Sequence, residues 1–270
     1  MGQPFFLPST VSEKTLLLIQ VGTPPDDIRA QVGDLPLWFS AVLAAGPAFK
    51  VVRVFEGEPL PRHDAHSAAI ITGSWAMVTD LLPWSEATAQ WIREAMARQM
   101  PLFGICYGHQ LMAHALGGKV DYHPQGREMG CLDIALLPGA EEEALLAGSG
   151  PHFKANLTHM QTVLELPPGA RVLARSAHDP HQVVRYGPHA VSTQFHPEFI
   201  QPVAAACIQL RAQVLQAEGF DPAAMLEQLM DTPVPQQMLQ RFVAAYAAQP
   251  ATAPVQPAAP VSQAETILTV

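Results

Sequence analysis

The sequence predicts an α/β fold with an open, mostly parallel, twisted sheet and helices on both of its faces. The first observation is that short apolar runs alternate with segments of helical spacing as far as Gly118, which is typical of βαβ units. The second is the composition, because 49% of the 270 residues are hydrophobic and only 14% are charged, enough to bury a large core. The third is an abrupt change from strand to helix within "PLFGICYGHQLMAHALGG".

Four apolar runs predict the strands of the parallel region, because each is short and ends near Gly, Pro or Cys. They are "KTLLLIQVG" (14–22), "FKVVRVFEG" (49–57), "HSAAIITGS" (66–74) and "PLFGIC" (101–106). Helical spacing follows in "LPLWFSAVLAAG" (35–46), "PWSEATAQWIREAMARQ" (83–99) and "YGHQLMAHALGG" (107–118). The last of these helices begins directly after the fourth strand, so only a tight turn at Cys106 separates them.

Beyond Gly118 the pattern changes to shorter strands with tight turns, which predicts an antiparallel or mixed extension of the sheet. These strands lie in "GCLDIALL", "HFKANLTHMQTVLEL", "ARVLARSA" and "HQVVRYGPHAVSTQFHPE". From Phe199 to about Ala248 the spacing is helical again. We therefore expect an N-terminal lead (1–13), an α/β domain (14–199), a helical extension packed on it (200–248) and an Ala/Pro-rich tail (249–270).

Charge and cysteine usage exclude several classes of function. A net charge of −9 and a pI near 5.6 argue against a nucleic-acid partner, because such proteins usually carry a basic face. No apolar run reaches the roughly 18 residues of a membrane span, and no basic region precedes a long apolar stretch as in a secretory signal. Three scattered cysteines favour free thiols in a reducing compartment, so we expect a cytoplasmic protein.

The stretch "GICYG" places Cys106 between Gly104 and Gly108 in the pattern Gly-x-nucleophile-x-Gly. A nucleophile on a sharp strand-to-helix turn projects above the sheet, and its neighbours must be small. The helix N-terminus favours the thiolate form of Cys106, and the backbone N–H of Tyr107 can face an oxyanion. Carboxyl ends of parallel strands are also where open α/β sheets bind ligands.

A cysteine nucleophile needs a base, and "QFHPE" near the end of the α/β domain offers one. His196 and Glu198 are two residues apart, so in an extended segment they face the same side. Pro197 cannot donate to a sheet ladder, which suits the end of a strand. The segment therefore predicts an imidazole oriented by a carboxylate.

Together, "GICYGHQ" and "QFHPE" resemble the class I, triad-type glutamine amidotransferase family, and most closely the glutaminase half of GMP synthase. The resemblance runs from about Lys14 to Glu198 and includes "IITGSWAMV", "GREMG" and "THMQTVLELPPG". It implies a flavodoxin-like α/β fold and a cysteine nucleophile that opens the side-chain amide of glutamine. It implies neither a cofactor nor a metal.

The resemblance assigns roles by position. Cys106 would be the nucleophile, His196 the base and acid, and Glu198 the residue that orients it. The oxyanion would be received by N–H groups of Tyr107 and of the turn at Gly73 and Ser74. The glutamyl group would be held by Gln110 and by the backbone around three consecutive residues: His159, Met160 and Gln161.

This chain departs from the synthetase-linked members of the family at the mouth of the site. Ser74 and Trp75 follow Gly73 where those members have a Gly-Gly-Pro run, and any requirement for positive φ is harder for Ser than for Gly. Met160 and Gln161 stand in place of Gly and Asp. The rim is therefore bulkier than in those members.

Two histidine pairs invite a metal hypothesis, but neither has suitable spacing. "HDAH" (63–66) falls in a predicted loop, and His109 and His114 are five residues apart rather than the four of a helical zinc pair. We expect His109 to pack against the sheet.

Three functions remain open at this stage. The first is a glutamine amidotransferase or glutaminase that passes ammonia to an unknown acceptor, which we expect to be a separate synthetase protein. The second is a stand-alone hydrolase of γ-glutamyl peptides or conjugates, which the altered rim favours. The third is a binding module without catalysis, which an intact set of Cys106, His196 and Glu198 disfavours.

Overall fold

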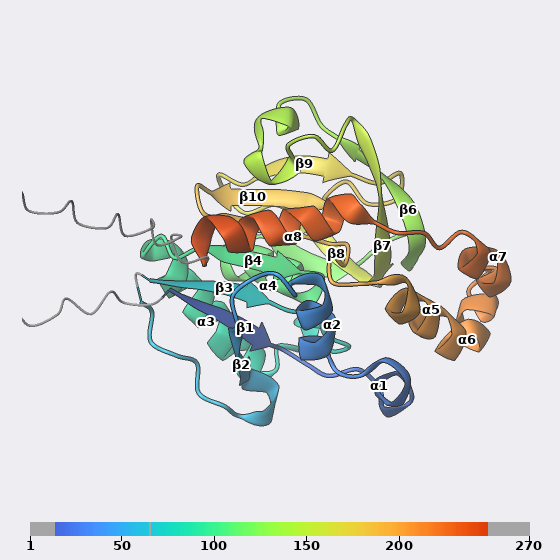
Figure 1. The fold of residues 1–270 in the computed structure, drawn as a ribbon, viewed down its shortest axis with the longest axis horizontal. Coiled ribbons are helices and arrows are strands. Elements are labelled where there is room, and N and C mark those ends of the chain that lie inside the picture. The colour runs from blue at the N-terminus through green and yellow to red at the C-terminus, as the bar shows by residue number, and fades with distance from the viewer. Residues whose placement is uncertain (1–13, 65, 248–270) are drawn as a thin grey trace, which may run out of the picture.

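A nine-stranded mixed sheet forms the centre of the protein in a computed structural model that describes residues 14–64 and 66–247 (Figure 1). The strand order is β2-β1-β3-β4-β11-β10-β9-β6-β7. The predicted lead (1–13) and tail (249–270) lie outside the described residues. Residue 65, within the "HDAH" stretch, is also outside them.

The sheet has a parallel half and an antiparallel half. The parallel strands are β2 (Phe49–Arg53), β1 (Thr15–Gln20), β3 (Ser67–Ile71), β4 (Leu102–Ile105) and β11 (Ala190–Thr193). The antiparallel strands are β10 (Val183–Gly187), β9 (Arg171–Arg175), β6 (Glu128–Leu136) and β7 (His152–His159). A separate two-stranded ribbon pairs β5 (Lys119–Tyr122) with β8 (Gln161–Glu165). The predicted parallel sheet with a mixed extension is confirmed.

Helices cover both faces of the parallel half because its strands are apolar on both sides. On one face, Leu17 and Ile19 of β1 pack with residues of α3 (Pro83–Ala97) and α4 (Tyr107–Ala115). On the other face, Leu16 and Leu18 pack with residues of α2 (Leu35–Val42) and α8 (Pro233–Tyr246). The helix α8, although last in the described chain, is therefore part of the central core.

A third apolar cluster lies toward the carboxyl ends of the parallel strands. It joins α1 (Asp26–Val32), α2, α5 (Gln201–Leu210), α6 (Ala212–Ala217) and α7 (Pro222–Glu227) through buried residues that include Ile28, Trp38, Phe199 and Leu215. Figure 1 shows α1, α5, α6 and α7 grouped at this end of the molecule. Chain segments far apart in sequence thus build one wall beside the strand ends.

A few elements differ from the sequence-based expectation. The strand predicted over 49–57 ends at Arg53, where the 3-10 turn η1 (Val54–Glu56) replaces it. The helix α1 was not predicted because it buries only Ile28, and β5 was not predicted because its residues are largely exposed. Three further 3-10 turns are η2 (Val78–Asp80), η3 (Ala140–Glu142) and η4 (Ala144–Leu146). No helix within 14–64 or 66–247 is long and apolar enough to cross a membrane.

Candidate active site

Cys106 occupies the turn between β4 and α4, in a backbone conformation that is rare for a residue with a side chain. Its φ is 50° and its ψ is −98°, and a positive φ at a non-glycine position stores strain that the surrounding structure must support. Its N–H donates to the carbonyl of Thr193 on β11 (2.9 Å), and its own carbonyl accepts from Gln110 N (3.0 Å). Bonds to the neighbouring strand β11 and to α4 therefore hold the turn.

The two glycines of the motif are required by space. A Cβ on Gly104 would lie 2.6 Å from the carbonyl oxygen of Gly108, and a Cβ on Gly108 would lie 2.4 Å from the carbonyl oxygen of Ile71. Neither glycine has a positive φ in the described chain. The pattern "GICYG" thus reflects how closely α4 approaches β3 and β4 behind the cysteine.

His196 and Glu198 follow β11 and lie buried beside the cysteine turn. The Nδ1–H of His196 donates to Glu198 Oε1 at 2.7 Å, and the imidazole stacks on the ring of Phe199, with centroids 4.1 Å apart. Its Nε2 has no hydrogen-bond partner among the described residues. One ring nitrogen is therefore fixed by a carboxylate, and the other is free to accept a proton.

The charge balance of this pair favours the protonated imidazole. Burial alone lowers the pKa of His196, but the charge of Glu198 and the interaction with Cys106 outweigh it and raise the pKa to about 10. An imidazolium paired with a thiolate is the form that makes a cysteine nucleophilic.

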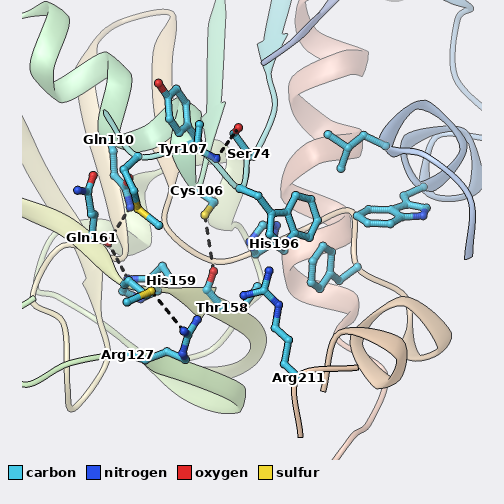
Figure 2. A pocket seen from close by; sticks show the side chains of 18 residues that line it. Ser74, Cys106, Tyr107, Gln110, Arg127, Thr158, His159, Gln161, His196 and Arg211 are labelled. Carbon is cyan, nitrogen blue, oxygen red and sulfur yellow. Dashed lines mark hydrogen bonds between the residues drawn. The ribbon is translucent and has the colours of Figure 1, made fainter. Parts of the chain in front are cut away.

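A cavity of about 150 Å³ opens at the thiol, and every predicted site residue except Glu198 lines it. Glu198 is fully buried behind His196. Figure 2 shows Cys106 near the middle of this cavity, with Gln110 and Gln161 on one side and His196 and Arg211 on the other. Residues from the two halves of the sheet and from the C-terminal helices thus meet at one site.

The predicted oxyanion turn at Gly73 and Ser74 accepts a serine at its second position without backbone strain. A Cβ on Gly73 would lie 3.1 Å from His196 Cε1 and 3.6 Å from Cys106 Cβ, so this position must stay small. Ser74 does not have a positive φ, so replacing glycine there costs no backbone strain. The N–H groups of Ser74 and Tyr107 donate to no other group in the described residues, which leaves them available to an oxyanion.

Gln110 and Gln161 are bonded to each other, to Gln194 and to the 3-10 turn η2. The Nε2 of Gln110 donates to the carbonyl of Gln161 (2.6 Å) and to Gln194 Oε1 (3.0 Å). The side chain of Gln161 accepts from Val78 N (3.0 Å) and donates to Thr79 Oγ1 (2.6 Å). Gln161 therefore ties the β7–β8 turn to η2 instead of extending into the cavity.

His159 forms a second buried histidine–carboxylate pair at the edge of the same cavity. Its Nδ1–H donates to the carbonyl of Gln161 (3.0 Å), and its Nε2 lies 2.9 Å from Glu128 Oε2, which also accepts from Gln182 Nε2 (2.7 Å). Both ring nitrogens are occupied, so this pair supports the β7–β8 turn.

The sequence reasoning missed two arginines and the aromatic residues Trp38 and Phe199 that line the cavity. Arg127 pairs with Glu218 through two nitrogens and donates to Met160 Sδ (3.2 Å). Arg211 lies between α5 and α6, with its guanidinium 5.8 Å from the ring centroid of Trp75. "GREMG" was the only signal that could have indicated Arg127, and no local motif marks Arg211.

Three of the histidines considered for a metal, His63, His109 and His114, have other partners. His63 contacts the carbonyl of Trp91 (2.9 Å) and stacks on its ring, and His114 lies 2.9 Å from Glu86 Oε1. His109 is fully buried against Ser192 Oγ (2.7 Å), as expected for a residue packed on the sheet.

Comparison with known proteins shows which family has a sequence pattern like that of this chain. A family model described as glutamine amidotransferase class-I matches residues 48–208. A glutamine-hydrolysing GMP synthase of Thermomicrobium roseum is 35% identical over 51% of this chain and 24% of the relative. One of the subunits of the glutamine-hydrolysing GMP synthase of Ignicoccus hospitalis is 39% identical over 36% of this chain and 50% of the relative. The chain thus spans between a quarter and half of these relatives.

A different kind of relative is covered more completely. γ-Glutamyl peptidase 5 of Arabidopsis thaliana is 30% identical over 63% of this chain and 70% of the relative. Among solved structures, a glutamine amidotransferase of Thermotoga maritima has a TM-score of 0.69 and 21% identity, covering 86% of this chain and 99% of its own. One from Methylobacillus flagellatus has a TM-score of 0.65 and 25% identity, covering 87% and 93%. These likenesses agree on fold and on the motif-bearing region.

Proposed function

The chain belongs to the class I glutamine amidotransferase family, and on that premise we propose that it hydrolyses the side-chain amide of glutamine through a Cys106–His196–Glu198 triad. The observation that carries the proposal is the different environment of the two ring nitrogens of His196. Nδ1 is bonded to a buried carboxylate, whereas Nε2, beside the strained cysteine turn, has no partner among the described residues. This is the arrangement that a cysteine nucleophile needs from its base.

The reaction then proceeds in two halves. The proton of the Cys106 thiol rests on His196 Nε2 in an imidazolium–thiolate pair, and the sulfur attacks the amide carbon of glutamine. N–H groups of Tyr107 and Ser74 stabilise the oxyanion, the C–N bond breaks, and His196 returns its proton to the departing ammonia. Water, deprotonated by His196, attacks the γ-glutamyl thioester and releases glutamate and the free thiol.

The glutamyl half of the substrate lies on the side of the cavity formed by Gln110 and the β7–β8 turn. Because Gln110 Nε2 already donates to Gln161 O and Gln194 Oε1, its amide oxygen is the atom left to accept from the α-ammonium group. Backbone N–H groups near Met160 receive the α-carboxylate. Ammonia passes to an acceptor protein, a proposal consistent with relatives that are named as one of the subunits of GMP synthase.

A second candidate is hydrolysis of γ-glutamyl peptides or conjugates by the same triad. Two observations favour it: the aromatic and arginine residues at the rim, and a γ-glutamyl peptidase of which the alignment covers 70%. The chemistry is unchanged, because only the amine that leaves is different.

The test is to incubate the purified protein with glutamine and to measure ammonia and glutamate separately. We expect equal amounts of both products, and loss of both in Cys106→Ala. Cys131→Ala is the matched control, because Cys131 is also a buried cysteine but lies on β6 away from the cavity. Turnover that survives Cys106→Ala would refute the triad.

A further inference from the structure

We propose that the cavity holds a second subsite, built by Arg211, Trp75 and Phe199, for a leaving amine that has an apolar body and a carboxylate. The substrate class is γ-glutamyl amino acids with aromatic or aliphatic side chains. The inference rests on the proposed triad, since it concerns the amine that the triad releases.

The position of the subsite follows from the proton that the leaving amine must receive. His196 supplies that proton, so the leaving group lies on the imidazole side of the Cys106 sulfur. Figure 2 shows Gln110 and Gln161 on the opposite side and the guanidinium of Arg211 on the imidazole side. The proposed position of the glutamyl half is the side of Gln110 and Gln161. Arg211 therefore faces the amine half of the substrate.

The charge of Arg211 is not balanced by a bonded partner. In residues 14–64 and 66–247, no carboxylate lies within ion-pair distance of its guanidinium, and it donates no side-chain hydrogen bond. Arg127, the other arginine at the cavity, is already paired with Glu218 at 2.7 Å. Burial and the charge of Arg127 lower the pKa of Arg211 by more than the charges of Asp27 and Glu218 raise it, so a bound carboxylate would relieve an unfavourable environment and could accept two hydrogen bonds.

The apolar wall beside Arg211 offers more contact surface than ammonia could cover as the leaving group. Trp38 makes edge-on contacts with Trp75 and Phe199, at centroid separations of 6.4 and 5.5 Å. The Arg211 guanidinium lies over Trp75, and Phe199 lies flat against His196. An amino-acid side chain can bury apolar surface here while its carboxylate reaches Arg211.

The chemical step balances without any other reactant. The thiolate forms a C–S bond, the C–N bond to the amino acid breaks, and its nitrogen takes the proton from His196. Water then cleaves the thioester, so each dipeptide and one water give one glutamate and one free amino acid.

The experiment compares two matched substrates, γ-glutamyl-phenylalanine and γ-glutamyl-phenethylamide, which differ only in the carboxylate. We expect kcat/KM to be at least about tenfold higher for the dipeptide, the effect of one charged hydrogen-bonded pair. Arg211→Gln should bring the ratio close to one, and Arg211→Lys should restore part of it. Arg175→Gln, which alters an exposed arginine on β9, should leave the ratio unchanged.

Other outcomes would overturn the inference in distinguishable ways. A ratio near one in the parent, or a ratio unchanged by Arg211→Gln in a protein with the parent's circular dichroism spectrum, means that Arg211 does not bind this carboxylate. Hydrolysis of glutamine with neither conjugate accepted refutes the subsite and leaves the proposed function standing. No turnover of any γ-glutamyl amide refutes both.

Discussion

Two buried histidine–carboxylate pairs each place their histidine in the wall of the same cavity, and they differ in what the second ring nitrogen contacts. His196 uses Nδ1 for Glu198 at 2.7 Å and leaves Nε2 without a partner among the described residues. His159 uses Nε2 for Glu128 at 2.9 Å and Nδ1 for the carbonyl of Gln161. The comparison teaches that burial and a carboxylate do not by themselves indicate a base, because a base also needs a free nitrogen facing its nucleophile.

The largest expected effect separates the two histidines directly. We expect His196→Gln to lower kcat by about 10³-fold or more, because members of a triad act as a unit. His159→Gln should leave kcat within about tenfold and instead lower the free energy of unfolding by about 1–3 kcal/mol, since Glu128 loses a buried partner. Steady-state kinetics and urea unfolding of both variants measure this. A folded His159→Gln without turnover would break the comparison.

Replacing the carboxylate of each pair should also lower kcat more at Glu198 than at Glu128, with smaller losses than for the histidines. Glu198→Gln keeps the hydrogen-bonding shape but removes the charge that favours the imidazolium of His196, so we expect a loss of about 10²-fold in kcat. Glu128→Gln, the matched change in the other pair, should lower kcat by less than about tenfold. Equal turnover of Glu198→Gln and the parent would show that Glu198 does not orient His196.

The glycine behind the cysteine should tolerate replacement by alanine less well than a glycine elsewhere in the molecule. Gly108→Ala places a Cβ 2.4 Å from the carbonyl oxygen of Ile71, so we expect a loss of about 1–3 kcal/mol in unfolding free energy together with reduced activity. Gly187→Ala on β10 meets only Met96 Cε at 3.8 Å and should change stability by less than about 1 kcal/mol. Urea denaturation of both variants tests the difference. Similar stabilities would mean that α4 does not approach β3 as closely as described.

The last of these predictions concerns pH. Folded His196 holds its proton to about pH 10, whereas the unfolded chain releases it near 6.5. The resulting stabilisation is fully present below pH 6.5 and is lost as the pH rises towards 10, with a slope of at most about 1.4 kcal/mol per pH unit. The difference in unfolding free energy between the parent and His196→Gln should therefore shrink over this window. A difference that does not change with pH would contradict the raised pKa of His196.

The parallel half of the fold and the placement of Cys106 and His196 could be predicted because their signals are local. Apolar runs indicated β1, β3 and β4, and "GICYG" and "QFHPE" placed the two residues at the ends of β4 and β11, two adjacent parallel strands. The strand predicted over 49–57 was too long because Val-rich sequence does not show where the chain leaves the sheet.

The rim of the cavity could be predicted only in part, at Ser74, Trp75, Met160 and Gln161, because the rest of it is assembled from distant segments. Trp38 on α2, Trp75 after β3 and Arg211 after α5 meet only through tertiary packing. The sequence identified Gln161 as a bulky rim residue, but its side chain is drawn to Val78 and Thr79, an interaction that spacing does not indicate. The residues that we propose to set the choice of leaving group are thus less visible in the sequence than those that we propose to cleave the bond.

The central claim is that Cys106, activated by His196, attacks γ-glutamyl amides. The most direct test is to treat the protein with a diazoketone analogue of glutamine and to locate the adduct by peptide mass spectrometry. We predict one adduct per chain, on Cys106, at a rate that falls by about 10²-fold or more in His196→Gln and little in His159→Gln. Labelling of Cys131 or Cys207 in place of Cys106, or equal labelling of Cys106 in both histidine variants, would contradict the account.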